Sequence, residues 1–288
     1  DVRIAYVNDF NSNSLENGII ALKSAKQDNK NIVIFNESLA IKYEDANHIK
    51  WLKNLDDAIQ EDRVLPFFMP MKNSVTQRID KYEALVRIID GDEVYTPDKF
   101  LDIAIASGKY PLITQIMIRK TFEYFKDIND IQFSINFSLS DILNEETTSV
   151  LFEHLAEYKY SENVIIELLE TEEISDFVLL NKFINDVKEY NAKVAIDDFG
   201  SGYSNFNYIL NLDIDIIKLD SCLIQNIFKD QNSILIVSNI VRTVKELGLR
   251  VVAERVSSKD IENILTIHDV DYLQGFHIGK PAPHILKG

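Results

Sequence analysis

Residues 64–89 read VLPFFMPM (64–71), KNSVTQRID (72–80) and KYEALVRII (81–89). The two outer stretches are rich in β-branched and aromatic residues, which predicts two strands. The connection between them is short and mostly polar, whereas a crossover between parallel strands takes about a dozen residues or more. These two strands are therefore predicted to form an antiparallel hairpin.

Six further strand-like stretches follow the hairpin, and amphipathic helical patterns lie between most of them. In 232–247, for example, Val237, Ile240, Val241, Val244 and Leu247 share one helical face. Strands that alternate with helices predict a parallel sheet, and eight of them predict a (β/α)8 TIM-like barrel of the α/β class, with one antiparallel strand. The six stretches are 131–137, 163–169, 193–198, 215–220, 250–255 and 271–276.

The first sixty residues do not continue this pattern. IALKSAKQDNKNIVIF (20–35) predicts a helix, a polar turn and a strand, and 48–62 predicts an amphipathic connecting helix. We therefore expect the end of an upstream module at 1–47, a linker helix at 48–62 and the barrel at 63–288. The chain begins with Asp1 rather than Met, which leaves room for an upstream sensor or membrane anchor.

Composition narrows the class of protein. The chain has 288 residues, 46% of them hydrophobic, and a formal net charge of −16. That charge argues against a sequence-independent DNA or RNA binder, which needs a basic surface. No apolar run approaches the ~18 residues of a membrane span. The single cysteine, Cys222, excludes a disulfide framework and favours a reducing, cytoplasmic setting.

Polar residues stand in or at the end of nearly every predicted strand. The carboxyl ends of parallel barrel strands carry the chemistry in this architecture. One acid alone is more often a helix cap or a solvated loop residue, but seven strands sharing the pattern favour a single cluster. These residues are Glu83, Asn136, Glu167, Asp197, Asp198, Lys218, Glu254 and Gln274.

Four or more acids at one barrel mouth would repel each other unless cations were bound. Oxygen ligands favour Mg²⁺ or Mn²⁺ over zinc, and the five histidines lie mostly away from the strand ends. In VAIDDFGSGYSN (194–205), Asp197 could bridge two metals ~3.5–4 Å apart while Asp198 binds the second. Two such metals suit in-line displacement at phosphorus.

The motifs resemble those of EAL-domain cyclic di-GMP phosphodiesterases. Glu83-Ala84-Leu85 followed by Val86-Arg87 resembles the signature of that family, and further matching segments follow in the family's order over about 64–285. The family fold is a barrel with one antiparallel strand. The matching segments are INFS (135–138), ELLE (167–170), IDDFGSGYSN (196–205), IKLD (217–220), AERV (253–256) and QGFHIGKP (274–281).

The resemblance implies a role for each matched position. Metal ligands are expected at Glu83, Asn136, Glu167 and Asp197 for a first ion and at Asp197, Asp198 and Glu254 for a second, with Mg²⁺ or Mn²⁺ as the cofactor. Lys218 would hold the attacking water or the phosphate, and Glu170 would steady the loop after Asp198. The implied catalytic residues are Lys218, Glu254, Asp198 and Glu170. The implied substrate-binding residues are Glu83, Leu85, Arg87, Gln274, Gly275 and Ser201.

The implied reaction is metal-dependent hydrolysis of cyclic di-GMP to the linear dinucleotide pGpG. The resemblance also implies a homodimer, and ALKSAKQDNKNIVIF (21–35) resembles the end of a diguanylate-cyclase-like (GGDEF) domain. Two alternatives stay open: a cyclic di-GMP receptor without catalysis, and an unrelated barrel hydrolase such as a glycosidase with two carboxylates.

Four departures from the family pattern bear on ligand affinity and turnover rather than on the metal ligands. Met69 stands where the family has Gln, and Ala104-Ile105 stands where it has Ala-Glu. Arg255 replaces a glycine and Ser257 a glutamate in the segment that the family writes A-E-G-V-E. Arg255 would either add a phosphate contact or crowd the mouth of the barrel.

Overall fold

The computed structural model describes residues 4–7, 21, 25, 32–34, 50–169, 177–200, 206–228 and 230–286. The chain divides into two compact units. One comprises Asp1–Glu61 and Pro97–Gly108, and the other comprises Asp62–Thr96 and Lys109–Gly288. The predicted residues Glu170 and Ser201 lie outside the described residues, as does most of 20–35.

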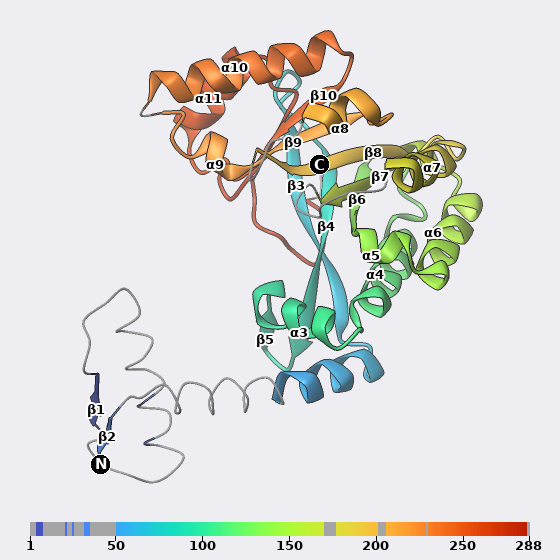
Figure 1. Ribbon diagram of the computed structural model, residues 1–288, viewed down its shortest axis with the longest axis vertical. Helices are drawn as coiled ribbons and strands as arrows, with labels where there is room; N and C mark the ends of the chain where they lie inside the picture. The colour runs from blue at the N-terminus through green and yellow to red at the C-terminus, as the bar shows by residue number, and fades with distance from the viewer. Residues whose placement is uncertain are drawn as a thin grey trace. The chain divides into compact units, whose positions relative to one another are not determined.

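The larger unit is a closed barrel of eight strands (Figure 1). Around the ring the order is β3, β11, β10, β9, β8, β7, β6 and β4, and pairing of β3 with β4 closes it. β3 is antiparallel to both neighbours, and the other pairs in the ring are parallel. The predicted fold class and its single antiparallel strand are confirmed. The strands are β3 (Val64–Asn73), β4 (Ile79–Asp90), β6 (Gln132–Phe137), β7 (Val164–Leu169), β8 (Lys193–Phe199), β9 (Ile216–Leu219), β10 (Arg250–Ala253) and β11 (Tyr272–Gln274).

The β3–β4 hairpin is longer than the sequence predicts. Its pairing runs from Val64↔Ile88 to Lys72↔Ile79, so both strands extend into the polar connection. The turn is held by the Asn73 side chain, which accepts hydrogen bonds from the N–H groups of Val75 and Thr76. A short strand, β5 (Glu93–Tyr95), extends the sheet beyond β4.

Helices connect the parallel strands. They are α4 (Tyr110–Phe125), α5 (Leu139–Ile142), α6 (Glu145–Glu157), α7 (Phe177–Lys188), α8 (Phe206–Asn211), α9 (Ser221–Ile224), α10 (Gln231–Glu246) and α11 (Lys259–Ile267), with a 3₁₀ turn, η2 (Ser161–Asn163), before β7. None of the helices in the described part of the chain is both long and apolar enough to cross a membrane.

Helix α10 lies where the sequence predicts a helix over 232–247. Asp230 caps it by accepting hydrogen bonds from the N–H groups of Asn232 and Ser233. Val237, Val241 and Val244 are buried, as predicted, but Leu247 is exposed because the helix has ended at Glu246.

The smaller unit contains a helix over residues 50–60, a 3₁₀ turn, η1 (Pro97–Lys99), and α3 (Leu101–Ala106). It also holds two short parallel strands, β1 (Ile4–Tyr6) and β2 (Ile32–Ile34), paired at Ile4↔Ile32. The helix falls within the predicted linker and β2 within the strand predicted at the end of 20–35. The assignment of 1–47 to an upstream GGDEF-like module stays a prediction.

An apolar layer fills the barrel at the amino ends of its parallel strands. Each member comes from a different strand, and all are at most 4% exposed: Met71, Ile165, Ala195, Ile216, Val252 and Tyr272. Because successive strand residues point to opposite faces, the residue two positions further on also points inward. In each parallel strand that contributes to this layer, the residue two positions further on therefore points into the barrel, nearer the carboxyl end of the strand.

Lys81 is a buried cation beside this apolar layer. Its ammonium lies 3.9 Å from the centroid of the Tyr272 ring, and the residue is 1% exposed. Burial, reinforced by the positive charges of Arg250 and Lys193, lowers the pKa of Lys81 to about 7. Between pH 7 and 10.5 the unfolded chain therefore binds more protons than the folded one. The free energy of unfolding consequently rises with pH over this range.

We expect Lys81→Met to stabilise the barrel at pH 6, where folding buries the charged amine. The free energy of unfolding should rise by about 1–4 kcal/mol, since one pKa unit corresponds to 1.36 kcal/mol. At pH 9.5 the gain should shrink, because the buried amine of the parent is then neutral. Urea unfolding of both proteins at the two pH values measures this. An equal or lower stability of the variant at pH 6 would contradict it.

Candidate active site

The polar residues predicted from strand ends form one layer above the apolar layer. Ile165, Ala195 and Ile216 belong to the apolar layer, and Glu167, Asp197 and Lys218 stand two residues further on. The same step leads from Val252 to Glu254 and from Tyr272 to Gln274. Strand alternation, combined with the parallel register, thus places these side chains in one group at the carboxyl ends.

Lys218 lies at the centre of this group and is 1% exposed. Its Nζ is 2.6 Å from Glu167 Oε2 and 2.9 Å from Asp197 Oδ1. It is also 2.8 Å from Glu254 Oε1 and 3.4 Å from Glu83 Oε2. Burial alone would lower the pKa of Lys218, but the four carboxylates outweigh it and hold that pKa well above its ordinary value. Lys218 is therefore a cation and not a general base in this arrangement.

Glu83 is held by two amides as well as by Lys218. Asn136 Nδ2 donates to Glu83 Oε1 at 2.8 Å, and Gln274 Nε2 donates to Glu83 Oε2 at 2.6 Å. Burial would raise the pKa of this carboxyl, but Lys218 and the two amide donors outweigh it, so the pKa is lowered. Glu83 is thus an ionised carboxylate in a fixed orientation. The Oε1 atom of Gln274 is buried and has no partner among the described residues, which leaves it free to accept from a ligand.

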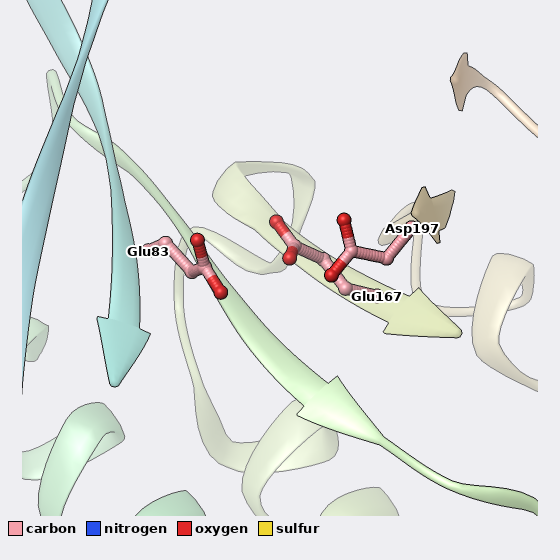
Figure 2. Close-up of side chains that lie close together, drawn as sticks. All are labelled: Glu83, Glu167 and Asp197. Atoms are coloured by element: carbon pink, nitrogen blue, oxygen red, sulfur yellow. The ribbon is translucent and has the colours of Figure 1, made fainter. Parts of the chain in front are cut away.

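The carboxylates form two groups that share Asp197. Glu83, Glu167 and Asp197 make one group, and Asp197, Asp198 and Glu254 make the other, with ligand atoms within 4.8 Å of one another in each. Figure 2 shows Glu83, Glu167 and Asp197 directed towards a common space from three different strands. All the ligand atoms of these two groups are carboxylate oxygens, and hard divalent cations prefer oxygen ligands, so the residues fit such ions. Asp197 belongs to both groups, and its role as a bridge between two ions stays a prediction.

Burial, together with neighbouring carboxylates, raises the pKa values of three carboxyls in these groups, those of Glu167, Asp198 and Glu254. Burial raises the pKa of Glu254 to about 8 and that of Glu167 well above its usual value. Burial, followed by repulsion from Asp197 and Asp220, raises the pKa of Asp198 to about 6. Each of these carboxyls would lose its proton more readily beside a divalent cation, because an opposite charge favours the ionised form. Cation binding at this site should therefore release protons.

Asp198 has an unusual backbone. Its φ is 55°, in the left-handed region that Asp and Asn enter more readily than most other side chains. This turn follows Asp197 directly, so the backbone changes direction between the two neighbouring aspartates. The change of direction allows both carboxylates to reach the second group. Strand alternation alone would have sent them to opposite faces.

A cavity of about 710 Å³ opens beside the acidic groups, a volume within the usual range for small-molecule sites. The predicted residues Glu83, Leu85, Asp197, Glu254, Gln274 and Gly275 line it. So do three positions at which the sequence departs from the family pattern, Met69, Arg255 and Ser257. The sequence did not indicate the remaining two, Gln225 and Phe276.

These two missed residues differ in the signal that they carry. Phe276 directly follows the matched Gln274-Gly275 pair and is 68% exposed, so its place in the motif could have indicated it. Gln225 comes just after α9, and nothing in its local sequence distinguishes it from a surface residue. Arg87 lies on the same face of β4 as Glu83 and Leu85 but is not among the described residues that line the cavity. Its Nη1 donates to the carbonyl of Val86 at 2.7 Å.

The backbone of Val256 leaves no room for a side chain at position 275, so glycine is required there. A Cβ atom there would lie 2.2 Å from the carbonyl oxygen of Val256 and 2.3 Å from its nitrogen. The backbone on either side is tied together, because the N–H of Val256 donates to the carbonyl of Gln274 and the N–H of His277 donates to that of Val256. This contact fixes the segment after Glu254 against the segment after Gln274.

A further buried carboxylate, Glu262 of α11, pairs with the turn that follows Gln274, beside this part of the cavity wall. It is paired with Lys72 of β3, with Lys259 Nζ at 2.8 Å and with His277 Nε2 at 2.9 Å. Burial opposes ionisation, but the hydrogen bonds from Lys259 and Lys72 outweigh it and lower the pKa of Glu262 to about 2. Glu262 thus links β3, α11 and the turn that follows Gln274.

We expect Glu262→Gln to lower the free energy of unfolding by about 1–3 kcal/mol at pH 7. The folded pKa lies below the unfolded one, so this contribution is complete above about pH 4.5 and is lost as the pH falls towards 2. Urea unfolding at pH 7 and pH 3 measures the difference. Asp260→Asn, at an exposed position of the same helix, is the matched control. A penalty that does not shrink at pH 3 would count against the ion-pair explanation.

The comparisons with known proteins agree with this architecture. The EAL domain family matches residues 52–281. The chain belongs to the EAL domain family. Its relatives include the cyclic di-GMP phosphodiesterase PdeF of Escherichia coli K12, 26% identical over 86% of this chain and 34% of the relative. The chain therefore spans about a third of the length of that protein.

Two solved structures have the same fold. An EAL domain protein from Listeria monocytogenes EGD-e is 27% identical, with a TM-score of 0.74 over 80% of this chain and 93% of the other. The FimX EAL domain of Xanthomonas citri, solved in complex with c-diGMP, is 21% identical, with a TM-score of 0.76 over 86% of this chain and 100% of the other. Both cover the barrel, so the family fold predicted from the hairpin and the strand-end motifs is confirmed.

Proposed function

We propose that this chain hydrolyses cyclic di-GMP to linear pGpG with the help of Mg²⁺ or Mn²⁺, two ions per site. The observation that carries the proposal is the pair of carboxylate groups joined by Asp197 beside a cavity of about 710 Å³. The name of the relative PdeF as a cyclic di-GMP phosphodiesterase supports the substrate and the reaction.

The cations, when bound, would activate a water and stabilise the leaving oxygen. Glu83, Glu167 and Asp197 would hold one ion, and Asp197, Asp198 and Glu254 the other. Asn136 positions Glu83, and Gln274 positions it from the opposite side while keeping its own Oε1 for the ligand. Asn136, as a further ligand of the first ion, stays a prediction.

Lys218 keeps its proton throughout. Its contacts with four carboxylates are available to orient them before cations bind, and its charge is then available to a phosphate oxygen or to the attacking water. The buried position of Lys218 keeps bulk water from screening that charge.

The proposal extends to the assembly. We include a homodimer and an upstream regulatory module, sensory or GGDEF-like, which the family resemblance implies. Sedimentation velocity over a range of protein concentrations tests the first, and a dimer that strengthens on addition of cyclic di-GMP would support coupling between the site and the interface.

The principal test is hydrolysis of cyclic di-GMP by the purified chain. After EDTA treatment the chain should have no activity, and Mn²⁺ or Mg²⁺ should restore it with pGpG as the product. Addition of Mn²⁺ or Mg²⁺ to the EDTA-treated chain should also raise the midpoint of thermal unfolding, because a ligand that binds the folded state stabilises that state. Binding of cyclic di-GMP without turnover in either metal would instead support a receptor function.

That second function is favoured by one specific observation. Met69, Arg255 and Ser257 depart from the family pattern. All three line the cavity, and none of them belongs to the two carboxylate groups. They change the surface that meets the nucleotide while leaving the carboxylates in place. Measured affinity and turnover on the same preparation therefore separate the two functions.

A further inference from the structure

Arg255 has a backbone conformation that its side chain disfavours. Its φ is 48°, in the left-handed region, where a residue other than Gly, Asn or Asp is uncommon. The family pattern has glycine here, which adopts this conformation without strain. The position is fixed on both sides, because the N–H of Glu254 donates to the carbonyl of Leu219 and Val256 is hydrogen-bonded to Gln274 and His277. The strain is therefore retained and not relieved by movement of the backbone.

The side chain of Arg255 is exposed and lines the cavity directly after Glu254. Among the described residues that line the cavity it is the single cation, and Glu83, Asp197 and Glu254 are part of the same lining. Its guanidinium has no hydrogen bond or ion pair with any residue in the described ranges. Its charge reaches the neighbouring Asp198, whose pKa it lowers against the larger effect of burial. Arg255 is thus a positive group at the mouth with no structural partner in those ranges.

Two further cations near the cavity, Lys218 and Arg87, already have partners. Lys218 is surrounded by four carboxylates, and Arg87 donates to a backbone carbonyl outside the cavity lining. A cation at the rim of an acidic cavity attracts a dianionic ligand towards it. A guanidinium suits this task, because its planar fork can bind two phosphate oxygens at once.

We propose that Arg255 is a substrate-binding residue that holds a phosphate of the cyclic dinucleotide at the rim of the cavity. The inference rests on the proposed function and deepens it. Strained backbone that surrounding structure maintains is concentrated at functional sites, and here the strain directs an unpaired cation to the cavity mouth. Ser257, two residues further on and also exposed on the cavity wall, can donate its hydroxyl to the same phosphate.

Three substitutions test this on the complete chain. Arg255→Gly removes the charge and the strain, and Arg255→Asn removes the charge while keeping a side chain that tolerates the left-handed region. Arg255→Lys keeps the charge but loses the fork. For the first two we expect the KM for cyclic di-GMP, and the Kd measured in EDTA, to rise about tenfold, while kcat changes less than about threefold. Arg255→Lys should fall between these variants and the parent.

Two further measurements separate binding from a structural role. The KM of the parent should rise with NaCl between 50 and 300 mM, and that of Arg255→Gly should rise less, since the screened charge is missing. The thermal midpoint of Arg255→Gly should be no lower than that of the parent, because glycine relieves the strain. Weaker binding by an equally stable variant is the result that a purely structural Arg255 could not give.

The outcomes also distinguish this inference from the proposed function. A parent that hydrolyses cyclic di-GMP, with unchanged KM, Kd and salt dependence in Arg255→Gly and Arg255→Asn, would overturn the inference alone. A parent that neither binds nor hydrolyses cyclic di-GMP would overturn the proposed function, and the inference with it. A parent that binds without turnover, and loses affinity in both variants, would support the inference for a receptor.

Discussion

Lys218→Met should give a protein that has almost no phosphodiesterase activity and that is much less stable without divalent cations. The substitution leaves four carboxylates at the barrel centre, Glu83, Glu167, Asp197 and Glu254, without their common cation. Removing one partner of a buried ion pair typically costs about 3–5 kcal/mol. We expect a loss of that size in EDTA at pH 8, measured by urea unfolding, and a smaller loss at pH 5, where more of the carboxyls are protonated.

Mn²⁺ should return much of the lost stability, because a divalent cation can replace the missing positive charge among the same oxygens. Activity should not return with it. The rate with saturating Mn²⁺ should stay at least about a hundredfold below that of the parent, since the charge directed at the substrate is gone. A variant as stable as the parent in EDTA would show that Lys218 does not hold the carboxylates together.

Lys81→Met is the matched control for this experiment. Both lysines are 1% exposed, both lie within the barrel, and both are replaced by the same side chain. Their surroundings are opposite, because Lys81 lies over the Tyr272 ring with a lowered pKa whereas Lys218 lies among carboxylates with a raised one. The two substitutions should therefore change the free energy of unfolding in opposite directions. A common loss would point to packing of the lysine stems and not to charge.

The sequence predicts the barrel because its information is local and repeated. The hairpin at 64–89 excludes a crossover by its length, and the later strands alternate with helices at regular spacing. The site follows from the same regularity, since Glu167, Asp197 and Lys218 stand two residues beyond apolar neighbours that fill the barrel. A parallel register then brings residues from distant parts of the chain to one level.

The features that the sequence does not predict depend on contacts between separate strands and turns. The sequence predicts one cluster that holds Lys218, Asp197 and Asp198, but which four carboxylates contact Lys218 depends on the closed ring. Gln225 reaches the cavity through the short helix after β9, and Glu262 is buried by partners from β3 and the turn after β11. The grouping of Pro97–Gly108 with the N-terminal unit is likewise not visible in their composition.

Asp198→Asn should leave the fold intact and reduce hydrolysis of cyclic di-GMP by about a hundredfold or more. Asparagine has the same shape, and it also tolerates the left-handed backbone at this position, where φ is 55°. The substitution removes one anionic oxygen donor from the group formed with Asp197 and Glu254 and leaves the group formed with Glu83 and Glu167 unchanged. Calorimetric titration should therefore show loss of the second Mn²⁺ and retention of the first.

The pH dependence of Mn²⁺ binding gives an independent readout. The pKa of Asp198 is raised to about 6 and that of Glu254 to about 8, so binding of the second ion to the parent must displace protons. Its affinity should consequently rise from pH 5.5 to pH 8.5. In Asp198→Asn the step near pH 6 should disappear, because the group that titrates there is absent.

Asp220→Asn is the matched control for the loss of a charge close to the same site. Asp220 contributes to the raised pKa of Asp198, but its own carboxylate caps α9 by accepting from the N–H of Cys222 at 2.8 Å. Asparagine can keep that cap, so activity should fall less than about tenfold and both ions should still bind. Equal losses in the two variants would mean that Asp198 acts through the net charge of the site, whereas a loss confined to Asp198→Asn would identify it as a ligand of the second cation.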